Sequence, residues 1–429
     1  MNCPLVGLSV RNPKMKLFQQ LLIAPAALGL IAPVAATANE LNINEGKTSD
    51  VVAEDLYAGQ FDDFETTTKL SGKVVFNVGA INLDDDVAGA DMGDKLTSGY
   101  VVQYNIKTSF TGEDKLYTRL KAGDMANTPW ENTAYNTHLK DAHNSTNAIQ
   151  VDKIWYEFPV GQFKVWAGPR IENSSMVASK PSIYKPLLKS FDLGGNGPVY
   201  GSSTSPGFGV AWVQPTESKS DFRWEVATNY AASGGDDSTR GILTDESQGK
   251  WLSKVGYGSP RMQVSLAYAQ NICRSDTTCR DWAANSSSTQ GGTTTGDSRG
   301  LGLRGYWKPE ETGIVPSIQV GLDQMDVDNT TTGTETEKQS MWMAGLTWKD
   351  AFQDGNKLAA AVMSPTIASS IRGGADDGAK SGLQWEVYYD VSINDGMTVT
   401  PAIFGAQDIS DGAATGHDDY LGAVVKTTN

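Results

Sequence analysis

The residues of this 429-residue chain that could do chemistry are mostly lysines and arginines at alternate positions of strand-like runs. Side chains of a strand point to opposite faces in turn, so residues two apart share one face. Where the other face is apolar, the basic face is expected to line a wet interior. Rings of Lys and Arg favour anions, so this interior is predicted to be anion-favouring or weakly selective. The predicted wall residues are Lys73, Lys107, Arg119, Lys121, Trp166, Arg223, Glu225, Arg261, Arg304 and Lys357.

A second group lies in the long polar segment 171–206, which Arg170 precedes. This segment is the third long connection in a barrel of about sixteen strands, and it is predicted to fold inward and narrow the lumen. Pro181, Pro186 and Pro198 stiffen it. Trp166 and Tyr184 could offer a sugar a stacking face, or they could simply be packing residues. The predicted constriction residues are Arg170, Lys180, Tyr184, Lys185 and Lys189.

No catalytic, metal or cofactor site is predicted. The three histidines, His138, His143 and His417, all fall in predicted loops, without a nearby cysteine ligand. The chain has no nucleophile elbow, P-loop or dinucleotide fingerprint. A formal net charge of -15 argues against a nucleic-acid partner. Cys273 and Cys279 share one long loop, where they could form a disulfide or remain two free thiols.

The elements that must position these side chains are strands. In 96–110 one face carries aromatic and branched residues such as Tyr100 and Val102, and the other carries Gln103 and Lys107. About sixteen such runs of roughly ten residues follow one another, the length that a tilted strand needs to cross a bilayer. The prediction is an all-β, transmembrane antiparallel barrel. The runs are 70–80, 96–110, 114–123, 148–158, 162–170, 207–214, 222–230, 250–257, 261–268, 299–307, 314–322, 340–348, 356–363, 383–391, 397–406 and 420–428.

The connections alternate between short and long, as in a barrel with tight periplasmic turns and long external loops. An aromatic residue precedes most short turns, which predicts a belt at the membrane interface, although strands are enriched in aromatics anyway. The predicted belt is Phe110, Phe158, Trp212, Tyr257, Trp307, Trp348 and Tyr389. The long connections carry acidic runs at 84–86, 236–237, 376–377 and 418–419. These are either solvated charge or sites for divalent cations that bridge to lipopolysaccharide.

The N-terminus has the pattern of a secretory signal. Basic residues precede an apolar run from Leu17, and Ala36-Thr37-Ala38 closes it. Residues 1–38 are therefore predicted to be a signal peptide, with a retained membrane anchor as the alternative. Residues 39–65 are predicted to be a short polar periplasmic lead, with an inward plug as the alternative, and 66–429 are predicted to form the barrel.

Three stretches resemble a known family: Thr66–Lys73, Ser109–Leu116 and 158–191. They are similar to cyanobacterial outer-membrane porins of the OprB-like, carbohydrate-selective class, also described as iron-uptake porins. The resemblance implies a homotrimeric outer-membrane pore that passes sugars and inorganic ions by passive diffusion. Members usually carry an S-layer-homology module and end in an aromatic residue. Residues 45–65 cannot hold such a module, and the chain ends at Asn429, which puts tethering to the cell wall and the integrity of the C-terminus in question.

One alternative belongs to another class of protein. A secreted or surface β-rich binding protein, such as an adhesin or a lectin-like sandwich, also consists of alternating strands. Such a protein would have no pore and would be soluble without detergent.

Overall fold

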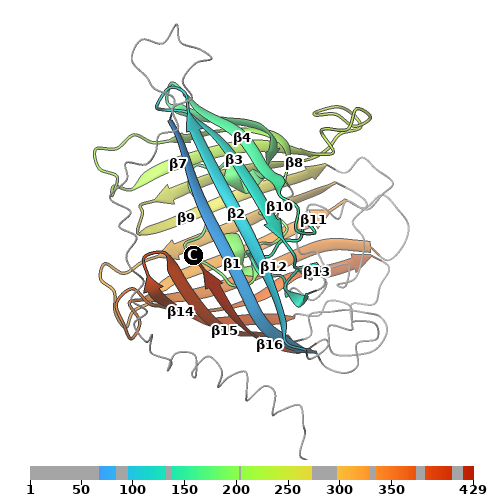
Figure 1. The fold of residues 1–429 in the computed structure, drawn as a ribbon. Helices are drawn as coiled ribbons and strands as arrows, with labels where there is room; N and C mark the ends of the chain where they lie inside the picture. The colour runs from blue at the N-terminus through green and yellow to red at the C-terminus, as the bar shows by residue number, and fades with distance from the viewer. Residues whose placement is uncertain are drawn as a thin grey trace, which may run out of the picture. The chain divides into compact units, whose positions relative to one another are not determined.

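The computed structural model describes residues 67–83, 95–126, 128–131, 137–201, 204–272, 297–328, 335–372, 382–407 and 419–429. These ranges hold sixteen strands and three short 3-10 helices (Figure 1). The strands are β1 (Thr67–Leu83), β2 (Thr97–Ser109), β3 (Lys115–Gly123), β4 (Gln150–Val160), β5 (Phe163–Ile171), β6 (Ser205–Val213), β7 (Arg223–Ser233), β8 (Gln248–Gly258), β9 (Met262–Ile272), β10 (Ser298–Trp307), β11 (Ser317–Val327), β12 (Glu335–Lys349), β13 (Lys357–Arg372), β14 (Leu383–Asn394), β15 (Met397–Gln407) and β16 (Tyr420–Thr428). The 3-10 helices are η1 (Pro129–Glu131), η2 (Asn173–Ser175) and η3 (Lys189–Gly194).

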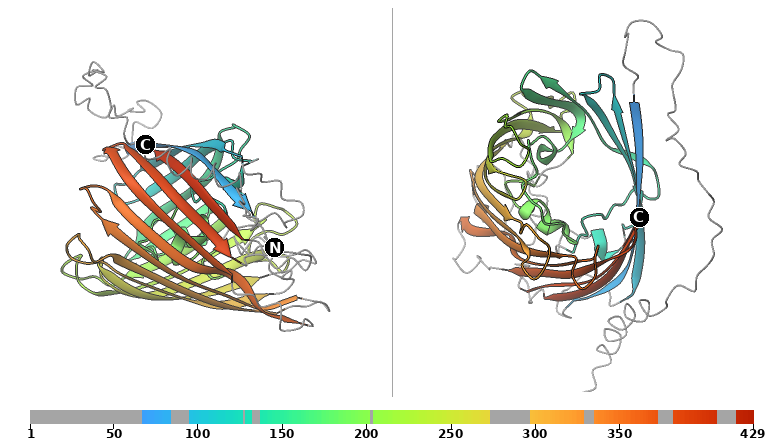
Figure 2. Two further views of the ribbon diagram at one scale, coloured as in Figure 1. Left: turned by 90° about the horizontal axis from the view of Figure 1, so that it is seen from below. Right: turned by 90° about the vertical axis from the view of Figure 1, so that its left-hand side faces the viewer.

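Each strand pairs antiparallel with its neighbours in sequence, and β1 pairs with β16 to close the barrel. The closing register places Val75 opposite Thr428 and Leu83 opposite Tyr420. In the right-hand view of Figure 2 the strands form a closed ring, and segments coloured green cross its interior. The prediction of an all-β antiparallel barrel of sixteen strands is therefore confirmed.

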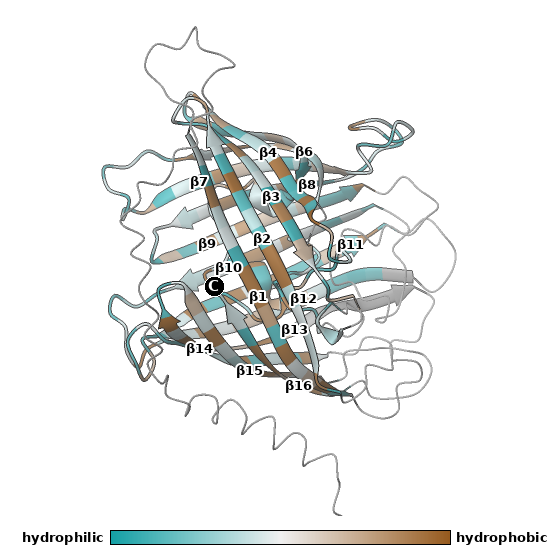
Figure 3. Ribbon diagram, in the orientation of Figure 1, coloured by the Kyte–Doolittle hydropathy of each residue, from teal (hydrophilic) through white to brown (hydrophobic). Residues whose placement is uncertain are grey.

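The two faces of the wall have opposite character. On β9 the side chains of Met262, Val264 and Leu266 are 41–57% exposed, whereas Gln263 and Ser265 on the other face are buried. Apolar residues thus point away from the barrel and polar residues point into it, and Figure 3 shows the apolar segments along the strands. This is the reverse of a soluble sandwich, whose strands bury their apolar face. Among the described residues no helix is both long and apolar enough to cross a bilayer.

Several strands extend further than the sequence predicted. Segments 323–339 and 364–381 were expected to be long connections, but β11 continues to Val327, β12 begins at Glu335 and β13 continues to Arg372. Backbone pairing between β11 and β12 and between β12 and β13 continues into these segments. The prediction was wrong at these boundaries because it relied on side-chain alternation, whereas the ladder needs only backbone groups.

The predicted belt residues stand at the ends of strands next to the tight turns. Phe110 and Tyr257 are 48% and 44% exposed, and the other members are partly exposed. Phe158 stacks on the neighbouring Tyr156 ring with centroids 5.3 Å apart. The Trp348 indole donates a hydrogen bond to the Ile314 carbonyl at 2.8 Å. A ring whose polar atom is bonded near the strand end suits an interface between lipid and water.

Some predictions fall outside the described residues. These are the signal segment 1–38, the lead 39–65, Cys273, Cys279 and His417. The acidic runs at 84–86 and 376–377 and residue Asp418 also lie outside them.

Candidate functional site

The described part of segment 172–204, between β5 and β6, is held by buried charged groups on the inner face of the wall. Glu386 on β14 accepts hydrogen bonds from the Tyr184 hydroxyl at 2.9 Å and from the Leu187 and Leu188 amides at 3.1 and 2.8 Å. Glu386 is completely buried. Because a buried carboxylate is costly without partners, these three donors fix the position of segment 184–188.

A second anchor forms on β10 and β11. Arg304 donates to the carbonyls of Leu193 and Gly195, both at 2.9 Å, and pairs with Asp323 at 2.6 Å. Its guanidinium also lies 4.6 Å from the centre of the Tyr200 ring, a cation–π distance. Arg304 and Asp323 have no exposed side-chain surface, so this pair holds the segment and does not meet solutes.

A third anchor involves β7 and β8. Glu225 accepts from the Ser179 hydroxyl at 2.7 Å and pairs with Lys254, which donates to the Ser179 carbonyl at 2.7 Å. Lys250 donates to the Pro198 carbonyl at 3.1 Å and to that of Gly201. Lys250 and Lys254 alternate with Trp251 and Val255, so strand periodicity could have assigned both lysines to the inner face.

The described part of segment 124–149, between β3 and β4, makes the same kind of inward contacts, which the sequence did not predict. Trp130 is fully buried and packs edge-on against Phe404 of β15. Asp141 pairs with Lys73 of β1 at 2.6 Å and with Lys426 of β16 at 3.4 Å. The available signal was the presence of Trp130, Met125 and Leu139 in an otherwise polar segment. Their partners are distant in the sequence and could not be predicted from it.

The two inward segments also bind each other. Leu139 and Leu188 form a backbone bridge, the Lys189 amide donates to the His138 carbonyl at 2.8 Å, and the Lys140 amide donates to the Leu187 carbonyl at 2.8 Å. Segment 124–149 and segment 172–204 therefore form one structure inside the wall.

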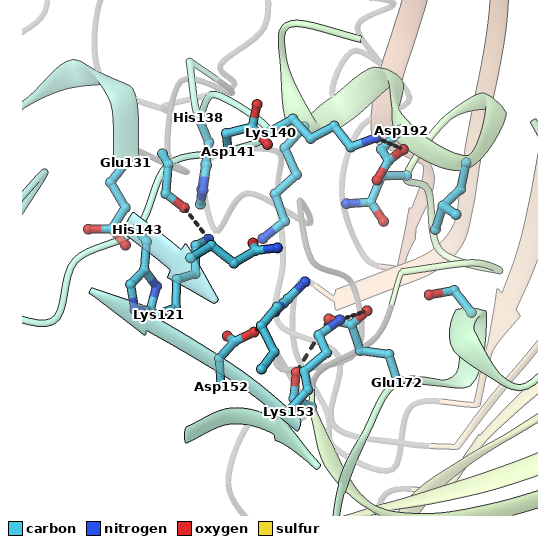
Figure 4. A pocket seen from close by; sticks show the side chains of 18 of the residues that line it. Lys121, Glu131, His138, Lys140, Asp141, His143, Asp152, Lys153, Glu172 and Asp192 are labelled. Atoms are coloured by element: carbon cyan, nitrogen blue, oxygen red, sulfur yellow. Dashed lines mark hydrogen bonds and ion pairs between the residues drawn. The ribbon is translucent and has the colours of Figure 1, made fainter. Parts of the chain in front are cut away.

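Two cavities remain beside this structure, against β3, β4 and β5. The outer cavity, about 450 Å³, reaches Lys121 and Asp152 near the long-loop ends of their strands (Figure 4). The inner cavity, about 440 Å³, reaches Lys115, Glu157 and Lys164 near the tight turns. Both are lined by Arg119, Lys140, Lys153, Glu172, Ser174, Asp192 and Leu193. Because they share these residues, the two cavities adjoin along the wall.

The charges of the two cavities differ. The outer cavity has five basic and five acidic side chains: Arg119, Lys121, Lys140, Lys153 and Lys189 against Glu131, Asp141, Asp152, Glu172 and Asp192. The inner cavity has seven basic and three acidic ones: Lys115, Arg119, Lys140, Lys153, Lys164, Lys180 and Lys185 against Glu157, Glu172 and Asp192. The positive excess is therefore on the tight-turn side.

Ion pairs neutralise many of these groups. Lys140 pairs with Asp192 at 2.7 Å and Lys164 with Glu157 at 2.9 Å. The remaining pairs are Arg119 with Asp152, Lys153 with Glu172, and Lys115 with Glu157. Burial is the largest single effect and raises the pKa of Glu172, but the charge and hydrogen bond of Lys153, together with the charges of Arg119 and Lys189, bring that pKa down to about 2.

The two described histidines add no charge to the outer cavity at neutral pH. Burial, with the nearby charges of Lys189 and Lys121, lowers the pKa of His138 to about 3. Burial and Lys121 also lower the pKa of His143. Within the described ranges, no group of three or more His, Cys, Asp or Glu side chains is arranged to hold a metal ion.

The structure separates the predicted constriction residues. Lys180, Lys185 and Lys189 line the cavities, and Tyr184 lines the inner one although it is 2% exposed. Arg170 lines neither cavity. A register shift in β5 pairs it with Ile154, on the face of β4 opposite to Lys153 and Trp155. Arg170 therefore points away from the two cavities.

The predicted wall residues also fall into distinct settings. Arg119, Lys121 and Trp166 line the cavities, and Trp166 is 2% exposed with its indole bonded to Glu157 at 2.8 Å. Lys73, Glu225 and Arg304 hold the inward segments, as described above. Lys357 pairs with Asp390 at 2.6 Å, and Arg261 pairs with Glu310 between two tight turns. Arg223 is half-buried and Lys107 is exposed, and neither lines the two cavities.

Comparison with known proteins shows a shared fold. No protein-family model matches the chain. The chain is similar to porin structures: OprB of Pseudomonas putida, with a TM-score of 0.54, 11% identity and coverage of 84% of this chain and 94% of that one, and OmpF of Salmonella typhi in complex with daunomycin, with a TM-score of 0.53, 12% identity and coverage of 85% and 98%.

Two curated relatives are uncharacterized cyanobacterial proteins. One, from Synechocystis sp., is 22% identical over 372 residues, covering 80% of this chain and 65% of the relative. The other, from Nostoc sp., is 26% identical over 202 residues, covering 43% of this chain and 32% of the relative. The chain therefore spans just under two thirds of one relative, and the match to the other spans about a third of it.

Proposed function

We propose that this chain is an outer-membrane porin that lets small hydrophilic solutes diffuse through a water-filled barrel. The observation that carries the proposal is the inverted wall, with large apolar side chains exposed outside and charged side chains inside. An apolar outer band stabilises a barrel in lipid, and a charged interior stays wet. An adhesin or lectin-like sandwich would have no reason to expose that band.

The passage runs through the outer and inner cavities, along β3, β4 and β5. Segments 172–204 and 124–149 narrow the lumen there, because the first is anchored on β7, β8, β10, β11 and β14 and the second on β1, β15 and β16. The charged linings suit inorganic ions and sugars. Sugar stacking on Trp166 or Tyr184 has little support, since each side chain is only 2% exposed.

The finer assignment is an OprB-like porin of a cyanobacterium, assembled as a homotrimer. The fold similarity to OprB and the two cyanobacterial relatives support it. Export by the segment 1–38, contact with lipopolysaccharide and a Cys273–Cys279 disulfide in an external loop belong to the same proposal.

The test is reconstitution of the purified protein into planar bilayers. The protein is expected to need detergent, to migrate faster on a gel before heating than after, and to give stepwise currents in KCl. Liposome swelling with sugars of increasing size then gives the size limit. A monomer that stays soluble without detergent and gives no current would contradict the proposal and favour the surface binding protein.

A further inference from the structure

Among the basic residues of the inner cavity, Lys180 and Lys185 differ from the others. The wall residues Lys115, Arg119, Lys153 and Lys164, and Lys140 of segment 124–149, each pair with a carboxylate. No carboxylate of the described residues lies within ion-pair distance of Lys180 or Lys185, and both side chains are exposed to the cavity. Each of these two lysines therefore contributes a positive charge to the inner cavity that no carboxylate of the described residues neutralises.

The two lysines also act on each other. Burial, followed by the positive charges of Lys140 and Lys180, lowers the pKa of Lys185. Asp192, the acid that opposes this effect, is itself bonded to Lys140 at 2.7 Å. Like charges held together in a confined space favour an anion between them.

The backbone between the two lysines is fixed in place. The Ile183 amide donates to the Gln319 side chain at 3.0 Å, and the Tyr184 hydroxyl donates to Glu386 at 2.9 Å. Each lysine is followed directly by a proline, Pro181 or Pro186, and these prolines restrict the chain further. An anion would therefore order two side-chain ends and no loop, which keeps the entropic cost of binding low.

The neighbouring polar groups complete the chemistry. Hydroxyls of Ser174, Ser175 and Ser182 line the same cavity. Ammonium groups and hydroxyls are donors, and a tetrahedral oxyanion has several acceptor oxygens for them. A monovalent halide gains less from two ammonium groups than a divalent anion does.

We propose that Lys180 and Lys185 form a binding step for multivalent oxyanions, such as inorganic phosphate or sulfate, on the tight-turn side of the passage. The step rests on the proposed function, because it lies within the conducting path. An oxyanion bound at these lysines slows the passage of chloride. The oxyanion can still cross the barrel.

The experiment measures the chloride current through the intact protein in planar bilayers at about 0.1 M KCl, where screening leaves such charges effective. Inorganic phosphate at pH 8 is titrated in, with nitrate as the monovalent control at matched ionic strength. The test variant is Lys180→Gln/Lys185→Gln. The matched control is Lys69→Gln/Lys107→Gln, which removes two positive charges from residues that are paired across β1 and β2 and line neither cavity.

Phosphate is expected to reduce the chloride current of the natural protein and of the control variant, whereas nitrate does not. In the test variant the half-blocking phosphate concentration is expected to rise by about tenfold or more. Gel mobility before and after heating checks that each variant is folded. Sulfate, tested in the same way, shows whether the step accepts oxyanions as a class.

Two results overturn the proposal and leave the porin function intact: a conducting natural protein whose current phosphate does not reduce, or a control variant that loses the block as fully as the test variant. A folded natural protein that gives no current overturns the porin function, and the binding step with it.

Discussion

The two sides of the barrel interior differ in what the inward segments do there. On the packed side, formed by β12–β16 with β1 and β2, apolar groups such as Trp130, Leu188 and Phe191 fill the space against the wall. On the open side, formed by β3–β5, charged groups face the two cavities. Apolar packing and buried anchors such as Glu386 and Arg304 hold the segments in position, whereas the charged groups of the open side line the proposed passage. Stability and selectivity should therefore respond to different residues.

The largest expected effect is on the packed side. Trp130→Ala removes a fully buried ring that packs against Phe404, so the free energy of unfolding is expected to fall by about 3–5 kcal/mol. Urea unfolding in detergent micelles measures it. Trp342→Ala, at a ring 41% exposed on the outer face, is the control and is expected to cost about 1 kcal/mol or less. Equal losses would mean that segment 124–149 is not fixed by this packing.

The next largest effect tests the anchor at Glu386, on β14 of the packed side. Glu386→Gln weakens three hydrogen bonds to segment 184–188 and is expected to cost about 1–3 kcal/mol of stability and to raise single-channel conductance. Asp390→Asn is the matched control, four residues along β14, since Asp390 bonds to Lys357 and Thr400 on the wall. An unchanged conductance in the Glu386 variant would show that this segment does not set the width of the passage.

Acid should loosen the inward segments. The folded-state pKa of Glu172 is about 2, below its ordinary 4.5. A lowered pKa stabilises the folded state above the unfolded value, and this stabilisation is lost as pH falls from about 4.5 to about 2. Lys426 and Lys73 likewise hold the pKa of Asp141 well below its ordinary value, against the effect of burial. Unfolding measured from pH 7 to 2 should show the loss, and Glu172→Gln should reduce it. A profile that the substitution does not change would contradict this role.

The smallest effect is expected on the open side. Lys121 lines the outer cavity, and the only described hydrogen bond of its ammonium group is to the Ala142 carbonyl at 3.3 Å. Lys121→Gln should shift the reversal potential in a KCl gradient by a few millivolts away from anion selectivity, with stability nearly unchanged. Lys219→Gln, at an exposed residue between β6 and β7, is the control and should shift neither. A shift of the same size in both variants would remove the link between selectivity and the open side.

The sequence predicted the wall far better than its contents. Alternation along β2 and β9 identified both the strands and their inner faces, because a strand's side chains take opposite faces whatever their neighbours are. The same rule placed Lys73, Arg119 and Arg304 on the inner face. It overestimated free positive charge, since it gave no account of carboxylates such as Glu157 and Asp192 that neutralise the lysines.

The inward segments could not be predicted in the same way. Trp130 contacts Phe404, which is distant in the sequence. Asp141 contacts Lys73, 68 residues away, and Lys426, 285 residues away. No local pattern encodes such contacts. A register shift of β5 likewise turned Arg170 away from the cavities, and such shifts leave no mark in the alternation.

The double ion pair of Asp141 has a consequence for assembly. Its two lysines come from the first and the last strand, which meet only when the cylinder is sealed. Before β1 and β16 pair, Asp141 can form an ion pair with only one of the two lysines at this position. The interior of the barrel would thus reach its final form last, and a copy in which β1 and β16 are not yet paired would differ from a finished one in its interior as well as in its wall.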